Sequence, residues 1–159
     1  MTEPKVKRVI KDTVFKDIFH QPEYQLKLFN ELHPELPDVS VEDIAFATLN
    51  PVLLDREYND IGLVVRDKFL ILVESQSTWS LNILLRSLLY TASTYKEYID
   101  AKDLNFYQTT PVHIPKPEIF VIYTGDQDVK QETISFSKEF FGDGSGFIEV
   151  KAKVIHDPE

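Results

Sequence analysis

The sequence predicts an α/β fold in which a mixed central sheet is flanked by helices. Residues 59–76 contain two apolar runs rich in β-branched residues around a charged break, which is typical of a buried β-hairpin. Residues 81–100 repeat apolar side chains at helical spacing, and residues 119–123 form the continuous apolar run of a central strand. In chain order, the expected elements are a helix, a strand, the hairpin, a long helix and a strand.

Helical structure is expected over residues 12–36, in two pieces. Asp12 is a good N-cap for the first piece, which ends near Gln21. Pro22 suits the first turn of the second piece, and Pro34 helps to end it. The Asp12 carboxylate could also approach a metal ion as a third acid, but capping already explains it.

The next strand is expected over residues 44–49, and the hairpin strands over about 60–66 and 69–76. Residues 77–80 offer hydroxyls that could cap the long helix. The side chains of that helix expected to face the core are Leu81, Leu84, Leu85, Leu88, Ala92, Tyr95 and Ile99. The neighbouring polar stripe is Asn82, Arg86, Tyr90 and Thr94.

The last part of the chain is less regular in pattern. Residues 133–141 are ambiguous between helix and strand. Residues 147–155 alternate as a half-exposed strand does. The side chains expected on its apolar side are Ile148, Val150, Ala152 and Val154.

Polar residues stand at the open end of the hairpin, where they could form a metal clamp. Asp60 begins the first strand, and Glu74 and Gln76 finish the second on one face, about 7 Å apart. Glu74 follows five apolar residues, so a carboxylate facing the protein there needs a partner.

The loop between the two strands decides whether the acids share a face. A two-residue turn at Asp67 and Lys68 sets residue 60 opposite residue 75, on the wrong face. A three-residue loop, or a bulge near Gly62, restores the match. We therefore predict an odd loop or a bulge.

Composition narrows the class of protein. A chain of 159 residues suits a single domain, 1–159, and the absence of cysteine excludes disulfides, thiolate metal sites and cysteine nucleophiles. Four scattered histidines disfavour zinc. The N-terminus is polar and basic, and no apolar run has the length of a membrane span, so we expect a cytoplasmic protein without membrane association. The net charge of −9 argues against extensive nonspecific binding to nucleic acid.

Four short motifs, taken with the order of elements, suggest a family. They are the segment Asp12 to Phe19, the pair Asn59 and Asp60, the triplet Glu74 to Gln76, and the segment Arg86 to Tyr90. With them the chain resembles the PD-(D/E)XK nuclease superfamily, and within it the recombination-promoting nuclease/putative transposase family, over about residues 10–125. The resemblance implies a restriction-endonuclease-like αβββαβ core and a metal-dependent DNA endonuclease associated with mobile elements and DNA recombination. Family members usually continue past this core, so a C-terminal extension is expected to be missing.

The resemblance also assigns roles to residues. Asp60 and Glu74 would bind Mg²⁺ or Mn²⁺, helped by the backbone carbonyl of Ser75, and Gln76 would complete the catalytic set. Gln76 stands where many superfamily members have lysine, although the named family is similar in carrying glutamine. Arg86 and Tyr90 would meet phosphate or brace the acids. The expected partner is DNA, and a homodimer is attractive, by analogy, for cutting both strands.

Two other interpretations stay open. The chain could be a catalytically inactive accessory or interaction module with the same fold, which the charge and the absent lysine favour. Asp60 would then cap a strand, Glu74 would pair with Arg86, and Gln76 would bond to backbone. The chain could also hydrolyse another phosphodiester, such as RNA.

Overall fold

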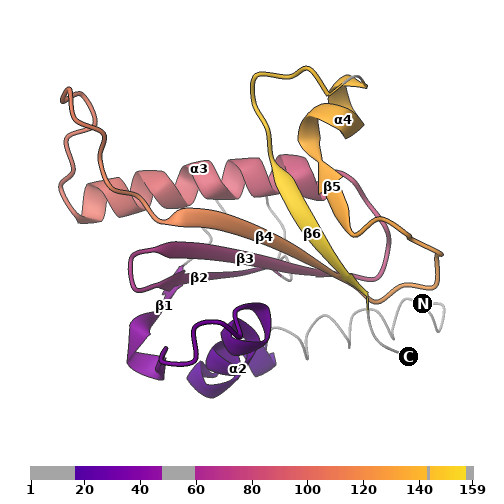
Figure 1. Ribbon diagram of the computed structural model, residues 1–159, viewed down its shortest axis with the longest axis horizontal. Coiled ribbons are helices and arrows are strands. Elements are labelled where there is room, and N and C mark those ends of the chain that lie inside the picture. Colours follow the sequence, from indigo (N-terminus) through magenta and orange to yellow (C-terminus); the bar gives the residue numbers. More distant parts are fainter. Residues whose placement is uncertain (1–16, 48–59, 143, 157–159) are drawn as a thin grey trace.

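The computed structural model describes residues 17–47, 60–142 and 144–156, and of residues 46, 47 and 60 it describes the backbone alone. Six strands form one mixed sheet in the order β1-β2-β3-β4-β6-β5 (Figure 1). The strands are β1 (Ile44–Ala47), β2 (Asp60–Val65), β3 (Phe69–Gln76), β4 (Lys116–Tyr123), β5 (Thr133–Ser135) and β6 (Lys151–His156). The helices are α2 (Pro22–Leu32), the short 3₁₀ helix η1 (Val41–Asp43), α3 (Ile83–Ala101) and α4 (Phe136–Phe141). The predicted α/β class, with a mixed sheet flanked by helices, is confirmed.

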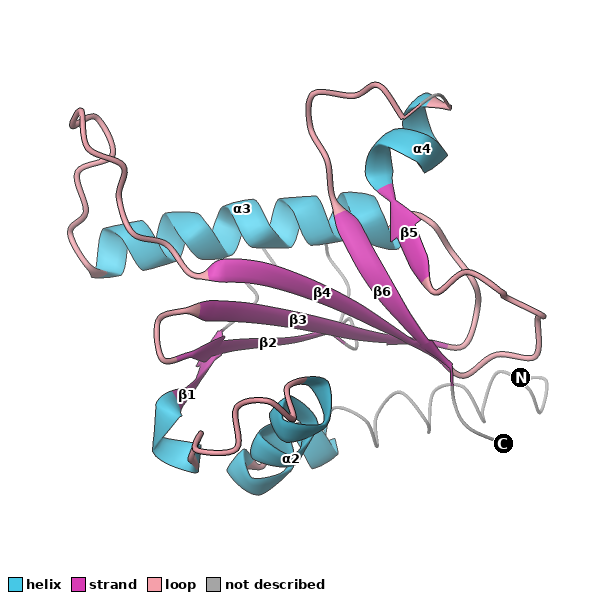
Figure 2. Cartoon of the chain, in the orientation of Figure 1, coloured by secondary structure: helices cyan, strands magenta, loops and turns pink. Residues whose placement is uncertain are grey.

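Helices cover both faces of the sheet, with α2 on one side and α3 on the other (Figures 1 and 2). Successive side chains of a strand point to opposite faces. Ile71 and Val73 therefore pack with Phe29 on the α2 side, whereas Leu70 and Leu72 pack with Tyr90 on the α3 side. By the same alternation Glu74 and Gln76 lie on the α3 side.

The second predicted N-terminal helix is confirmed as α2, with Pro22 in its first turn. Residues 17–19 are helical before it, while Asp12 and the start of the first piece lie outside the described residues. His33, at the end of α2, contacts Glu35 through Nδ1 at 2.7 Å and Glu118 of β4 through Nε2 at 2.6 Å. The hydrogen bond with His33 lowers the pKa of the Glu35 carboxyl. These contacts link the end of α2 to β4, a central strand of the sheet.

The long helix α3 is present as predicted, and its predicted core face is confirmed in part, since Leu84 is buried and Leu81, Leu88 and Tyr95 pack against the core. Its buried side chains are Ile83, Leu84, Ser87, Tyr90 and Thr94. Leu85 is 40% exposed and Ala92 is also exposed, so their predicted core positions are wrong. The buried positions 83, 87, 90 and 94 are themselves at helical spacing, and Tyr90 among them packs on Leu70 and Leu72 of the sheet. The expected hydroxyl cap is not found: the N-cap of α3 is Asn82, which makes no side-chain capping bond, and Ser80 Oγ accepts from the Asn82 amide at 3.3 Å, before the helix begins.

The central position of the strand predicted at 119–123 is confirmed, since β4 lies between β3 and β6. The ambiguous segment 133–141 is β5 followed by α4. The predicted strand at 147–155 is wrong in its first four residues, because β6 begins at Lys151 and Ile148 is 58% exposed. The reason lies in Glu149, whose Oε1 accepts from the Ser137 amide at 3.2 Å and so turns the chain toward α4. The bonds from Ser137 also lower the pKa of the Glu149 carboxyl.

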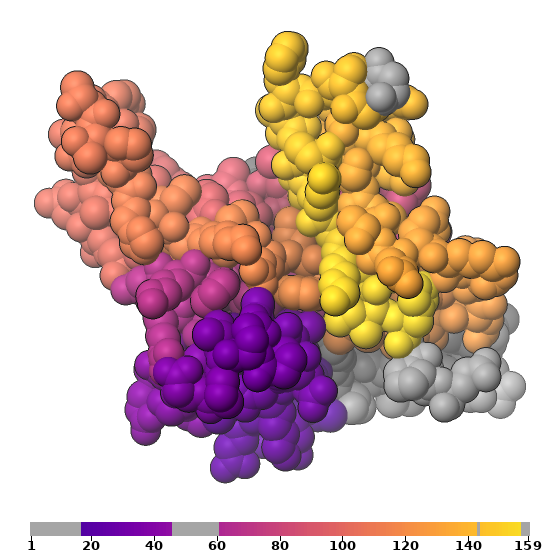
Figure 3. All heavy atoms as spheres, in the orientation of Figure 1, coloured from indigo at the N-terminus to yellow at the C-terminus, as the bar shows by residue number. Residues whose placement is uncertain are grey.

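The surface view shows two segments that project to the same side of the molecule, at the top of the view: the loop over 102–115 on the left and the region around α4 on the right (Figure 3). The surface between them is hollowed, and α2 lies on the opposite side, at the bottom of the view. In the ranges that the structure describes, no helix is both long enough and apolar enough to cross a membrane.

Candidate functional site

The hairpin formed by β2 and β3 has the odd loop that the sequence predicted. Val65 is opposite Phe69, so three residues, 66–68, connect the strands. Continuing the register along the ladder sets Asp60 directly opposite Glu74. Directly opposed residues lie on one face of an antiparallel pair, so position 60 shares the α3 side of the sheet with Glu74 and Gln76.

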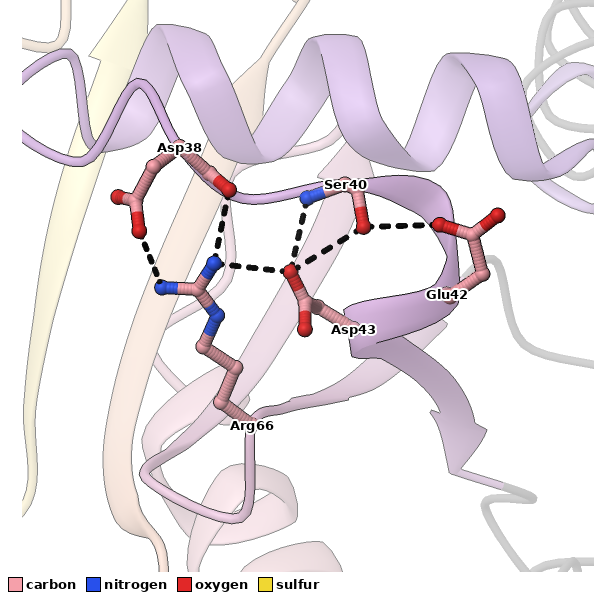
Figure 4. Close-up of polar contacts among 5 residues, drawn as sticks. All are labelled: Asp38, Ser40, Glu42, Asp43 and Arg66. Atoms are coloured by element: carbon pink, nitrogen blue, oxygen red, sulfur yellow. Dashed lines mark hydrogen bonds and ion pairs between the residues drawn. The ribbon is translucent and has the colours of Figure 1, made fainter.

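A cluster around Arg66 holds this loop (Figure 4). Arg66 has a positive φ of 51°, an uncommon conformation for a residue with a side chain. Its guanidinium donates to Asp38 Oδ2 at 2.9 Å, to the Asp38 carbonyl at 2.8 Å and to Asp43 Oδ2 at 2.9 Å. Asp43 also accepts from the Ser40 amide at 2.9 Å. The bonds from Arg66 lower the pKa of both carboxyls, and the cluster ties the loop to the segment that precedes β1.

Backbone bonds to β4 define the directions of the groups at the open end of the hairpin. The carbonyls of Lys68 and Gln76 accept from the amides of Lys116 (2.8 Å) and Thr124 (3.1 Å), on the β4 side. Backbone groups alternate in direction along a strand, so the Ser75 carbonyl points to the opposite side, toward β2. For the same reason Asp60 and Glu74 form a non-hydrogen-bonded pair, in which the Cα atoms are about 4.5 Å apart.

Glu74 lies beneath the first turns of α3, where it forms an ion pair. The residue is only 7% exposed, and its Oε1 accepts from Nη2 of Arg86, whose side chain is 19% exposed. Burying a carboxylate without compensation is costly, and the guanidinium supplies the opposite charge. The partner expected for Glu74 on sequence grounds is therefore present.

Gln76 occupies the next position on the same face and is also 7% exposed. Its Nε2 reaches the Ser80 carbonyl at 3.5 Å, at the long limit of a hydrogen bond. Both this contact and the pair between Glu74 and Arg86 are those that the accessory-module interpretation expects.

Tyr90 lies one turn beyond Arg86 and is 9% exposed, facing the sheet. Glu74, Tyr90 and the 2% exposed Ser87 line the same small cavity between α3 and the sheet, with room for about one water molecule. Ser87 is not among the candidate site residues predicted from the sequence. Its spacing of four residues from Ile83 and three from Tyr90 is the pattern that could have found it.

One end of the sheet thus brings together position 60, Glu74, the Ser75 carbonyl and Gln76 with Arg86 and Tyr90 of α3. Asp12, the remaining candidate, lies outside the described residues. Among the described side chains, no group of three or more His, Asp or Glu residues is arranged to hold a metal ion. A cation here would accordingly depend on Asp60 and Glu74 together with backbone or solvent oxygens, which are ligands that Mg²⁺ accepts. Comparisons of the chain with protein-family models, with curated proteins and with solved structures found no match.

Proposed function

We propose that the protein is a metal-dependent nuclease that hydrolyses phosphodiester bonds in DNA, with Asp60 and Glu74 holding Mg²⁺ or Mn²⁺. The register that sets Asp60 opposite Glu74 carries the proposal. Opposed residues of an antiparallel pair have Cβ atoms about 4.5–5.5 Å apart. At ligand distances of about 2 Å, two carboxylates at that separation can bind one cation.

The order of elements supports the same proposal. α2, β1, β2, β3, α3 and β4 follow one another as in the αβββαβ core that the resemblance to PD-(D/E)XK nucleases implies. The acids stand at the end of the central hairpin, next to the start of the long helix. We therefore assign the chain, as part of this proposal, to the recombination-promoting nuclease/putative transposase family within that superfamily.

Each residue of the site has a role in the proposed reaction. The two carboxylates and the Ser75 carbonyl supply the hard oxygen ligands that Mg²⁺ prefers. When bound, the cation polarises the scissile phosphodiester and lowers the pKa of the attacking water. Gln76 orients water or phosphate through its amide, without the positive charge of a lysine. Arg86 binds phosphate, and Tyr90 supports the buried floor of the site.

A second candidate is a catalytically inactive accessory module. The ion pair between Glu74 and Arg86 favours it, because the carboxylate is already compensated without a metal ion. The net charge of −9 also disfavours contact with a polyanion. The two candidates differ in metal-dependent cleavage.

Incubation of supercoiled plasmid with the full chain and Mg²⁺ or Mn²⁺ tests the proposal. We expect nicked or linear product that Asp60→Asn and Glu74→Gln each reduce at least about a hundredfold, the scale of losing a group that stabilises the transition state. Asp67→Asn is the matched control, since Asp67 is an exposed acid at the loop end of the same hairpin, paired with Lys102.

The other outcomes separate the alternatives. Cleavage that persists in both site variants would come from another site or a contaminant and would contradict the proposal. Cation binding without cleavage would favour the accessory module. Faster cleavage of a matched RNA than of DNA would reassign the substrate, and the product form, nicked or linear, reports whether two copies act together.

A further inference from the structure

We infer that Arg86 is an exchangeable counter-ion of the metal site: its guanidinium compensates Glu74 while no cation is bound, and turns to the substrate phosphate when a cation enters. This inference rests on the proposed function, because it concerns the same carboxylate. It differs from the roles assigned above in making metal binding and the release of Arg86 one event.

Arg86 and Glu74 are in direct contact. Arg86 Nη2 donates to Glu74 Oε1, and the two side chains are 19% and 9% exposed. A guanidinium and a divalent cation carry charge of the same sign, and at a few ångströms from each other they repel strongly in a partly desolvated site. A cation that binds both carboxylate oxygens of Glu74 therefore requires the guanidinium to leave Oε1.

The exposure and position of Arg86 decide where a displaced guanidinium can go. Arg86 is the more exposed member of the pair, and it lies in the first turns of α3. The first turn of this helix contains no acidic residue. The helix N-terminus also favours negative ligands, and a planar guanidinium binds phosphate through two parallel hydrogen bonds. The released side chain is thus suited to a phosphate placed beside the cation.

An exchangeable counter-ion and a purely structural ion pair respond differently to the loss of Arg86. If Arg86 only positions Glu74, removing it leaves the carboxylate misplaced and weakens cation binding. If Arg86 competes with the cation, removing it strengthens cation binding. The two roles therefore predict opposite signs for one measurement.

The experiment measures Mn²⁺ binding to the full chain by electron paramagnetic resonance, with calorimetry as a second readout. We expect Arg86→Gln to bind Mn²⁺ at least about tenfold more tightly than the wild-type chain, equivalent to about 1.4 kcal/mol. Adding Glu74→Gln to that variant should abolish the binding. Lys96→Gln is the matched control, because Lys96 pairs with Asp100 on the exposed side of the same helix. It should bind Mn²⁺ as the wild-type chain does.

Two further variants keep the test informative. Arg86→Lys retains the charge and should stay within about threefold of the wild-type affinity, a change of about 0.65 kcal/mol. Arg86→Met keeps the apolar stem that packs along the helix, so it replaces Arg86→Gln if that variant does not fold. In the presence of Mn²⁺, loss of Arg86 should weaken binding to a duplex oligonucleotide even though the metal binds more tightly.

Failure of the Arg86 exchange and failure of the metal site give different binding results. Glu74-dependent binding in the wild-type chain, with weaker or unchanged binding in Arg86→Gln, would overturn the exchange and leave the proposed function standing. Absence of Glu74-dependent binding in both the wild-type chain and the Arg86 variants would overturn the metal site itself and the inference with it. Binding that appears only when Arg86 is removed would support the exchange most strongly.

Discussion

The ion pair between Arg86 and Glu74 should contribute less to stability than its burial suggests. Arg86→Met leaves a carboxylate that is 91% buried without the guanidinium, and breaking a buried pair costs 3–5 kcal/mol. Because Arg86 is 19% exposed and solvent can partly replace it, we expect about 3 kcal/mol, the lower end of that range. Glu74→Leu should cost about 1.5 kcal/mol, since the remaining guanidinium can turn toward solvent.

The double variant Arg86→Met, Glu74→Leu shows how much the ion pair itself contributes to stability. Replacing a buried pair by apolar residues of similar volume is often neutral, so Arg86→Met with Glu74→Leu should lie within about 1 kcal/mol of the wild-type chain. The coupling energy is then about 3.5–4.5 kcal/mol, above the usual range of about 0.5–3 kcal/mol for residues in contact. If apolar residues can replace the pair without loss of stability, the pair serves the candidate site rather than the stability of the fold.

The assay is urea unfolding followed by circular dichroism, in the presence of a chelator so that no cation contributes. The exposed pair Lys96 and Asp100 gives the reference cycle, with an expected coupling of at most about 0.5 kcal/mol. The reasoning would be refuted by additive losses in the double variant, with a coupling near that of the reference cycle. Unchanged m-values are needed for the comparison, because a changed slope reports a different unfolded or native state.

Three further predictions concern the scaffold. Phe29→Ala, at a side chain that is 0% exposed, should lower the free energy of unfolding by about 3–5 kcal/mol in urea titrations, and a loss below 1 kcal/mol would contradict its central position. Arg66 lowers the pKa of Asp38 and Asp43, so their contribution is present above the unfolded values near 4 and is lost as pH falls through the lower folded values. Acid titration of Arg66→Gln should therefore show a flatter loss of stability below about pH 4 than the wild-type chain, and an equal slope would contradict the cluster. Gly125→Ala would set a Cβ 2.3 Å from a backbone carbonyl oxygen and should cost at least about 1 kcal/mol in thermal unfolding; an unchanged midpoint would contradict that close approach.

The hairpin and its register could be predicted from the sequence because both are local. The β-branched runs defined the strands, and the requirement that Asp60 and Glu74 share a face demanded an odd loop. The structure has that loop at 66–68. What holds the loop could not be predicted, since Arg66 binds Asp38 and Asp43, residues more than twenty positions away in the chain.

The face of α3 that meets the core was predicted in part from its leucines. Leu84 is buried, and Leu81 and Leu88 pack against the core as expected. Leu85 is exposed whereas Ser87 and Thr94 are buried, because the predicted apolar stripe is wider than the strip of helix that the sheet covers. The start of β6 was missed because Glu149 bonds to α4 rather than continuing a strand. At the candidate site, the need of Glu74 for a partner could be predicted from its position after a buried strand. The burial of both partners became visible only in the fold.

The central claim is that Asp60 and Glu74 converge on one cation at the open end of the hairpin. Its most direct test is a crystal of the full chain soaked in Mn²⁺, with diffraction recorded at the manganese absorption edge. The account predicts one anomalous peak about 2 Å from carboxylate oxygens of both residues, and its loss in Glu74→Gln. No peak there, in crystals whose packing leaves this end of the hairpin open to solvent, would contradict it.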